Sequence, residues 1–235
     1  MHDEPIPQSA PKVQSPSSIN LFDICPLQYA HRYVLKTLKF KTSPQIEEGV
    51  EFHKAMYLRA GMGIPLPDAY QRMEPTMKVL DQWGTDGWTV DLEAGLAVDA
   101  DFKPVEWADR YKQTNGLENK LDVVAVKGDR GRIVDWKTGK PKDDITQLLV
   151  NSITALAHYP RVESFAAAFA YSTTMTLSQP AKFERSNPKL KTTIKAKIMM
   201  IAKAHERGLF PPSPSGLCKS WCDVFSCKHN GRTGP

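Results

Sequence analysis

Three residues in the middle of the chain have the types and spacing that metal-assisted chemistry on phosphate requires: Asp122, Asp135 and Lys137. Asp135 and Lys137 are separated by one residue, so in a β-strand they project from the same face while Trp136 points to the other. A carboxylate can hold a divalent cation. A lysine beside it can orient the attacking water or stabilise the charge that develops on a phosphate.

The residues around this trio predict a β-hairpin. Residues 121–126 and 133–136 are apolar runs, and the segment 127–131 between them is rich in Gly and Asp. A surface hairpin that carries an ordinary i, i+2 ion pair is the alternative interpretation of the D-x-K triplet. The assignment therefore depends on the rest of the chain.

Two motifs resemble those of a known nuclease group. Asp122 followed by the run DWKTGK at 135–140 resembles the active-site signature of the PD-(D/E)XK nuclease superfamily, and in particular its RecB-like branch. The run from Gly49 to His53, G-x-x-x-H, resembles the first motif of that branch. The resemblance implies that His53, Asp122, Asp135 and the main-chain carbonyl of Trp136 bind Mg²⁺ or Mn²⁺. It also implies that Lys137 positions or activates the water.

A third motif of the branch is matched only in part. RecB-like nucleases carry Q-x-x-x-Y on the helix after the hairpin, and the apolar spacing of residues 145–156 predicts a helix there. Gln147 supplies the glutamine, but Asn151 stands in place of the tyrosine. Only Gln147 is therefore carried over as a residue of the catalytic site.

The elements that must position these residues follow from caps and periodicity. Ser43 and Pro44 predict the start of the helix that carries His53, and residues 67–83 predict a second helix with a break at Pro75. Residues 88–98 alternate as a half-buried strand or strand pair with Glu93 on its polar side, where it could join the site or remain solvated. Residues 165–177 predict one long strand, and residues 187–208 a lysine-rich helix.

The four cysteines favour a metal site over disulfides, if the chain is cytoplasmic as we expect. Cys218, Cys222 and Cys227 lie close together in the tail, and Cys25 is the only other cysteine. One upstream and three downstream cysteines resemble the iron–sulfur RecB-like nucleases, which include the AddB nuclease domain and CRISPR-associated spacer-processing nucleases. The resemblance implies a [4Fe–4S] cluster that joins the chain ends. A Zn²⁺ site, made of the four cysteines or of three with His229, is the alternative.

The expected fold class is α/β, with a restriction-endonuclease-like mixed central sheet flanked by helices. We expect residues 1–16 to be a disordered tail and 17–235 to be one domain. Within it, 17–86 form an N-terminal helical part, 87–180 the catalytic sheet core, and 181–235 a C-terminal helix and cysteine cluster. No apolar run is long enough for a membrane span, and 41% hydrophobic residues suffice for a core.

The net charge of +5 suits a phosphate-rich partner. We expect a metal-dependent, sequence-nonspecific nuclease acting on DNA, preferentially single-stranded and by analogy as an exonuclease, in recombination, repair or DNA processing. A helicase or recombinase partner would fit this role. The alternatives are a catalytically silent nucleic-acid-binding module that serves such a partner, and a zinc-stabilised structural protein. The intact Asp-Asp-Lys set argues against both.

Overall fold

The computed structural model describes residues 6–38, 43–141 and 145–232. Within these ranges, one sheet has the strand order β2-β1-β3-β4-β5-β6, and β7 pairs with β5. The strands are β1 (Thr89–Val98), β2 (Pro104–Val105), β3 (Leu117–Lys127), β4 (Arg130–Lys137), β5 (Ser164–Tyr171), β6 (Thr176–Leu177) and β7 (Ala181–Glu184). Strands β4 and β5 pair in parallel, whereas the neighbouring pairs β3–β4 and β1–β3 are antiparallel. The sheet is therefore mixed, as predicted.

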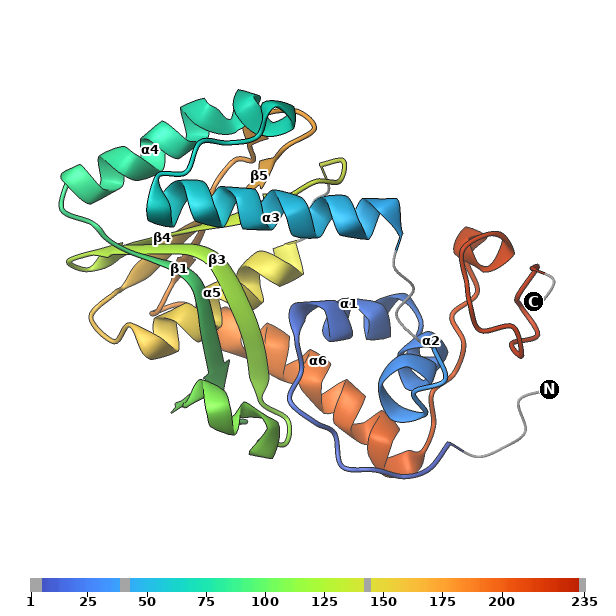
Figure 1. Cartoon of the computed structure of the whole chain (residues 1–235). Coiled ribbons are helices and arrows are strands. Elements are labelled where there is room, and N and C mark those ends of the chain that lie inside the picture. Colours follow the sequence, from blue (N-terminus) through green and yellow to red (C-terminus); the bar gives the residue numbers. More distant parts are fainter. Residues whose placement is uncertain (1–5, 39–42, 142–144, 233–235) are drawn as a thin grey trace.

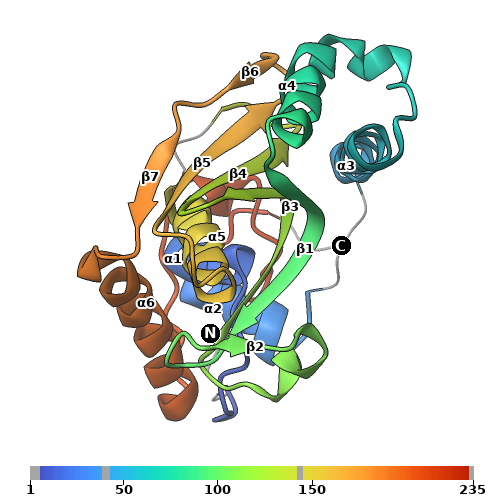
Figure 2. The same cartoon turned by 90° about the vertical axis from the view of Figure 1, so that its left-hand side faces the viewer.

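Helices cover both faces of the sheet (Figures 1 and 2). On one face, α1 (Pro16–Ile24), α5 (Ile145–His158) and α6 (Pro188–Arg207) contribute to the larger cluster of buried apolar side chains. On the other face, α3 (Pro44–Met62) and α4 (Glu74–Thr85) form the smaller cluster with β3 and β4. The short elements are α2 (Pro26–Tyr29), η1 (Ala30–Val34), η2 (Asp68–Met73), η3 (Trp107–Lys112) and η4 (Gly216–Lys219). The α/β fold with a mixed sheet between helices is confirmed.

Local sequence signals account for the helix ends. The Ser43 side chain accepts a hydrogen bond from the Ile46 N–H, and Pro44 occupies the first turn of α3. Gly63 ends this helix in the left-handed conformation, with φ of 68°. Pro75 lies in the first turn of α4, so the predicted break is the junction between η2 and α4. The helix that presents His53 is thus fixed at both ends.

One prediction about the strands is wrong. The long strand expected over 165–177 is divided by a turn into β5 and β6, and Met175 in this turn has φ of 55°. The alternation of apolar residues continues through the turn, and the turn contains neither Gly nor Pro. The sequence pattern therefore did not indicate that the strand is interrupted. Within the expected tail over 1–16, Val13 and Gln14 are buried, Gln14 forms a bridge with Leu117, and Ile6 packs against the larger cluster. Residues 1–5 lie outside the described residues.

The N-terminal segment is attached to the fold through His205 on α6. The imidazole Nδ1 lies 2.9 Å from the Ser9 hydroxyl, and Nε2 lies 3.1 Å from the Tyr29 hydroxyl. Burial lowers the pKa of His205, and it raises the pKa of Tyr29 to about 12 despite an opposing hydrogen bond to Gln14. Both groups are therefore neutral at pH 7. None of the helices in the described ranges is long and apolar enough to cross a membrane.

The buried His205 predicts a loss of stability in mild acid. In the unfolded chain its pKa is about 6.5, so the unfolded state takes up a proton at higher pH than the folded state does. Stability therefore falls as the pH drops below about 6.5 towards the folded-state pKa. His205→Gln keeps a hydrogen-bonding side chain but cannot titrate. Its deficit in urea midpoint against the wild type should shrink between pH 7.5 and pH 5, and a constant deficit would contradict this account.

Candidate active site

The predicted hairpin is formed by β3 and β4, and its strands separate at the two aspartates. A two-residue loop begins at Gly128, whose φ of 60° suits glycine. From there the paired residues run from Lys127 and Arg130 to Val123 and Val134, where the pairing stops. Asp122 and Asp135 would form the next pair. Beyond this point β3 remains paired with β1, and β4 remains paired with β5. The opening between the strands is where both carboxylates lie.

The neighbouring pair β1–β3 bends at the same level (Figure 1). The ladder is continuous on both sides of Glu93 and Asp122 but leaves these two residues unpaired. Glu93 has φ of 55°, which is uncommon for a residue with a side chain. Leu92 packs with the cluster under α3 and α4, whereas Ala94 packs with the cluster under α5. Residues two apart thus lie on opposite faces, and the bend brings Glu93 beside Asp122.

Asp122 connects the hairpin to α3. Its Oδ1 lies 2.9 Å from Nδ1 of His53, and its Oδ2 accepts the main-chain N–H of Trp136 at 2.8 Å. Burial by itself lowers the pKa of His53. The hydrogen bond to Asp122 and the negative charges of Asp122 and Asp135 outweigh it, so the pKa of His53 is raised. His53 and Asp122, both predicted metal ligands, thus lie side by side, and the hydrogen bonds hold both groups in position.

Asp135 is buried and surrounded by donors. Its Oδ2 lies 2.6 Å from Lys137 Nζ, and its Oδ1 accepts hydrogen bonds from Gln147 at 2.6 Å and Asn151 at 3.4 Å. Burial raises the pKa of Asp135, and the ammonium of Lys137 opposes that rise. Trp136, between them in sequence, is buried against the other face of the sheet. The expected same-face geometry of Asp135 and Lys137 is therefore what the fold contains.

Sequence reasoning missed the role of Asn151. This residue replaces the tyrosine of the helix motif, yet its side chain reaches Asp135 and also accepts a hydrogen bond from Asn119 at 2.9 Å. Thr154 completes the buried network by donating to Asn119 at 2.8 Å. Gln147, Asn151 and Thr154 are spaced by four and three residues along a largely apolar helix. That polar stripe was the signal that could have identified the network.

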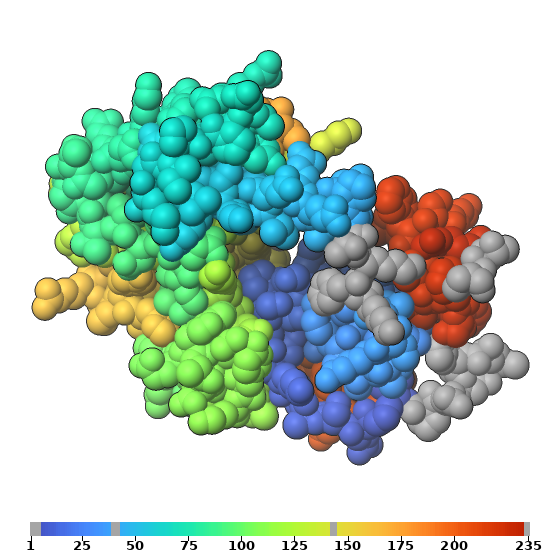
Figure 3. Space-filling view, viewed as in Figure 1, coloured from blue at the N-terminus to red at the C-terminus, as the bar shows by residue number. Residues whose placement is uncertain are grey.

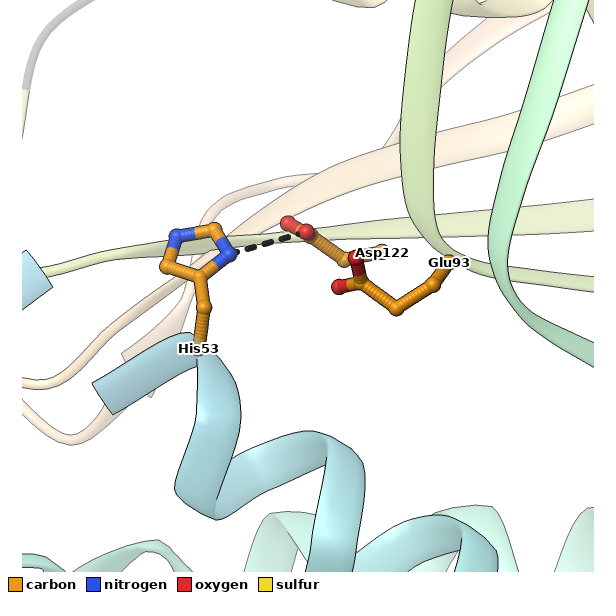
Figure 4. Close-up of side chains that lie close together, drawn as sticks. All are labelled: His53, Glu93 and Asp122. Carbon is orange, nitrogen blue, oxygen red and sulfur yellow. Dashed lines mark hydrogen bonds and ion pairs between the residues drawn. The ribbon is translucent and has the colours of Figure 1, made fainter. Parts of the chain in front are cut away.

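His53, Glu93 and Asp122 could hold a cation together. Their ligand atoms all lie within 4.8 Å of one another (Figure 4). One imidazole nitrogen and two carboxylates from three different elements suit a divalent ion such as Mg²⁺ or Mn²⁺. Asp135 does not belong to this group, because its oxygens face Lys137 and α5. The main-chain N–H of Trp136 donates a hydrogen bond to Asp122. The main-chain carbonyl of Trp136 remains a predicted metal ligand.

A polar groove of about 380 Å³ leads away from Lys137 and Gln147. The start of α1 forms one wall, and β3 and α5 form the other. Besides those two residues, the lining consists of Ser15, Pro16, Ser17, Asn20, Asn119, Lys120 and Asn151. In the space-filling view the surface is hollowed where α3 stands above the N-terminal elements (Figure 3). The groove gives a phosphate chain a route to the lysine.

The four cysteines come from opposite ends of the chain and meet in space. Burial raises the pKa of the Cys222 thiol against an opposing main-chain hydrogen bond from Val224, and Cys218, Cys25 and Cys227 lie near enough to raise it further. The N–H of Ser213 approaches Cys25 Sγ at 3.5 Å, so the tail passes beside α2. All four thiols are free. The four thiols are therefore available for a metal.

A model of the PD-(D/E)XK nuclease superfamily matches residues 14–227. No curated protein gave a significant match. Among solved structures, a provisionally assigned exonuclease from Eubacterium rectale is similar, with a TM-score of 0.50 and 12% identity over 95% of this chain and 90% of that one. The protein SSO0001 gives a TM-score of 0.41 and 12% identity over 94% of this chain and 89% of that one.

Proposed function

This chain belongs to the PD-(D/E)XK nuclease superfamily, and on that premise we propose that it is a metal-dependent DNA nuclease of the RecB-like type. The observation that carries the proposal is the separation of β3 and β4 at Asp122 and Asp135. It places His53 beside one carboxylate and Lys137 beside the other. In an ordinary hairpin the β3–β4 pairing would continue through Asp122 and Asp135, and the strands would not open around the two carboxylates.

The proposed catalytic ion is Mg²⁺ or Mn²⁺, with His53, Asp122, Asp135 and the carbonyl of Trp136 as its ligands; Asp135 would exchange its contact with Lys137 for the ion. The donor set fits, because these are nitrogen and oxygen ligands of the kind that such ions accept. When bound, the ion polarises the scissile phosphate and lowers the pKa of its water. The Trp136 N–H fixes the orientation of the Asp122 carboxylate through a bond of 2.8 Å.

Lys137 is proposed to position or activate the attacking water. Its ammonium lies 2.6 Å from Asp135 and lines the groove through which a phosphate chain would approach. Gln147 and Asn151 hold the other oxygen of Asp135, so the carboxylate cannot rotate away from the lysine. The burial that raises the pKa of Asp135 also strengthens its attraction for a cation. These contacts support a preorganised site.

We also propose a [4Fe–4S] cluster on Cys25, Cys218, Cys222 and Cys227. Cys25 lies near the three tail cysteines, which supports a metal centre that joins the two ends of the chain. One upstream and three downstream cysteines resemble the iron–sulfur RecB-like nucleases, and this resemblance favours iron–sulfur over Zn²⁺. In a cytoplasmic setting, free cysteines favour a metal over disulfides.

The proposed substrate is single-stranded DNA, cut without sequence specificity in recombination, repair or processing. No described element has the form of a major-groove reader, and the polar groove offers donors to phosphates. The provisional assignment of the Eubacterium rectale protein supports exonuclease action. Residues 17–235 would act as one nuclease domain, alone or with a helicase or recombinase partner. The rival proposal, a silent binding module, predicts no cleavage.

Linear single-stranded, circular single-stranded and blunt duplex DNA should be cleaved at different rates in Mn²⁺. An end-dependent, single-strand nuclease degrades the linear strand fastest and releases short products from the outset. The measurement is gel analysis of end-labelled and internally labelled substrates over time. Faster loss of the circle would contradict exonuclease action, and discrete duplex fragments would contradict the substrate assignment.

A further inference from the structure

We propose that Lys120 couples metal binding to DNA binding: it neutralises Glu93 in the metal-free protein and contacts a DNA phosphate once a cation takes that carboxylate. The inference rests on the proposed function and assigns a role to Lys120, which none of the matched motifs includes. Lys120 and Glu93 both lie on the bend of the β1–β3 pair. Glu93 is itself unpaired in the ladder, and Lys120 is two residues from the unpaired Asp122. The arguments are the position of Glu93, the exposure of Lys120, and the groove that Lys120 shares with Lys137.

Glu93 is held at the site by an unusual backbone. Its φ of 55° is costly for a residue with a side chain, and it faces Asp122 across the break in the ladder. A solvated glutamate on a regular strand would need neither feature. With its carboxylate within 4.8 Å of ligand atoms of His53 and Asp122, it forms the third corner of the candidate cation site (Figure 4). Glu93 is therefore placed where it could bind the same cation as His53 and Asp122.

Lys120 is the ion-pair partner of the Glu93 carboxylate in this structure. Its ammonium forms an ion pair with Glu93, and its side chain is 58% exposed. Exposed ion pairs contribute little to stability, so a divalent cation can displace the lysine at small cost. Once the cation is bound, Lys120 and the ion carry like charges and repel each other. The ammonium of Lys120 is then available to pair with another anion.

The next available space for Lys120 is the groove that it already lines. Lys137, Gln147 and Asn151 line the same groove, which therefore connects the displaced ammonium to the catalytic lysine. A single DNA strand entering it would bring phosphates within reach of both lysines. Metal binding would then create a phosphate contact that the metal-free protein lacks. By thermodynamic reciprocity, DNA would also strengthen metal binding.

The variant Lys120→Ala separates the two roles. Without DNA it should bind Mn²⁺ about two- to fivefold more tightly than the wild type in titration calorimetry, because the competing ammonium is gone. With Ca²⁺ bound, it should bind a fluorescent single-stranded oligonucleotide severalfold more weakly. The slope of log K against log salt should also fall by about 0.7, the share of one phosphate contact. Without metal, its DNA affinity should equal that of the wild type.

Lys182→Ala is the matched control, because Lys182 is also an exposed lysine on a strand, 65% exposed and paired with Glu184 at 2.6 Å. Lys182→Ala should change neither the affinity for Mn²⁺ nor the affinity for DNA. A second variant, Glu93→Gln, releases Lys120 permanently and should raise the metal-free affinity for DNA. Equal Mn²⁺ affinity in the two lysine variants, or a DNA defect in Lys120→Ala that is the same with and without Ca²⁺, would overturn the coupling. Wild-type protein that binds no Mn²⁺ would overturn the proposed function as well.

Discussion

Asp135→Asn is expected to reduce the rate of DNA cleavage at least about 100-fold, the order that loss of one electrostatic partner of a transition state costs. The change keeps the shape of the side chain but removes the negative charge that faces Lys137 at 2.6 Å. Because Asp135 is buried, Asn is a better test than Ala, which would also leave Lys137 and Gln147 without their acceptor. The measurement is the single-turnover cleavage rate at saturating Mn²⁺.

Glu184→Gln is the matched control for this prediction. Lys182 and Glu184 form another i, i+2 pair on a strand with the same 2.6 Å separation, but both side chains are exposed on β7. The substitution should leave cleavage unchanged. Lys137→Met should lose cleavage to a similar extent as Asp135→Asn. Full activity in Asp135→Asn, with folding verified by an unchanged urea midpoint, would show that the hairpin charges are an ordinary ion pair.

Cys25→Ser is expected to remove the bound iron and to destabilise the whole domain by several kcal/mol, since a structural metal contributes its binding free energy to folding. Cys25 follows α1, whereas its three partners lie in the tail about 190 residues later. The cluster would therefore close a loop that includes almost all of the chain. Anaerobically purified wild-type protein should be brown, and the variant colourless. Iron content and urea unfolding measure the two effects.

Trp221→Ala is the control for the cysteine variant. Trp221 lies between Cys218 and Cys222 and is 76% exposed, so its loss alters the same loop without removing a ligand. It should keep the colour and the stability of the wild type. Wild-type protein that contains one Zn²⁺ and no iron would decide for the alternative metal. Unchanged iron and stability in Cys25→Ser would contradict a cluster that joins the chain ends.

The hairpin and its charges could be predicted because local rules determine them. Two apolar runs around a Gly-Asp break fix the turn, and an i, i+2 spacing fixes that Asp135 and Lys137 share a face. The helix carrying His53 followed from its cap and proline. The meeting of His53 with Asp122 depends on packing between distant segments. It was expected only through the family resemblance.

The bend at Glu93 could not be predicted, because a glutamate in the left-handed conformation has no sequence signature. Alternation placed residues 88–98 on one regular strand, but the apolar side chains change faces at Glu93. The network of Asn151, Asn119 and Thr154 was equally hidden, since it joins a helix to a strand 32 residues earlier. Such features arise from tertiary contacts and not from local propensity.

The most direct test of the nuclease assignment is incubation of metal-depleted protein with end-labelled single-stranded DNA, with and without Mn²⁺. The account predicts no cleavage without the ion, and degradation to short products with it. Binding of the strand without cleavage at any Mn²⁺ or Mg²⁺ concentration would contradict the account and would identify the chain as a silent binding module. Cleavage that proceeds unchanged in a chelator would contradict the metal-dependent site at Asp122 and Asp135.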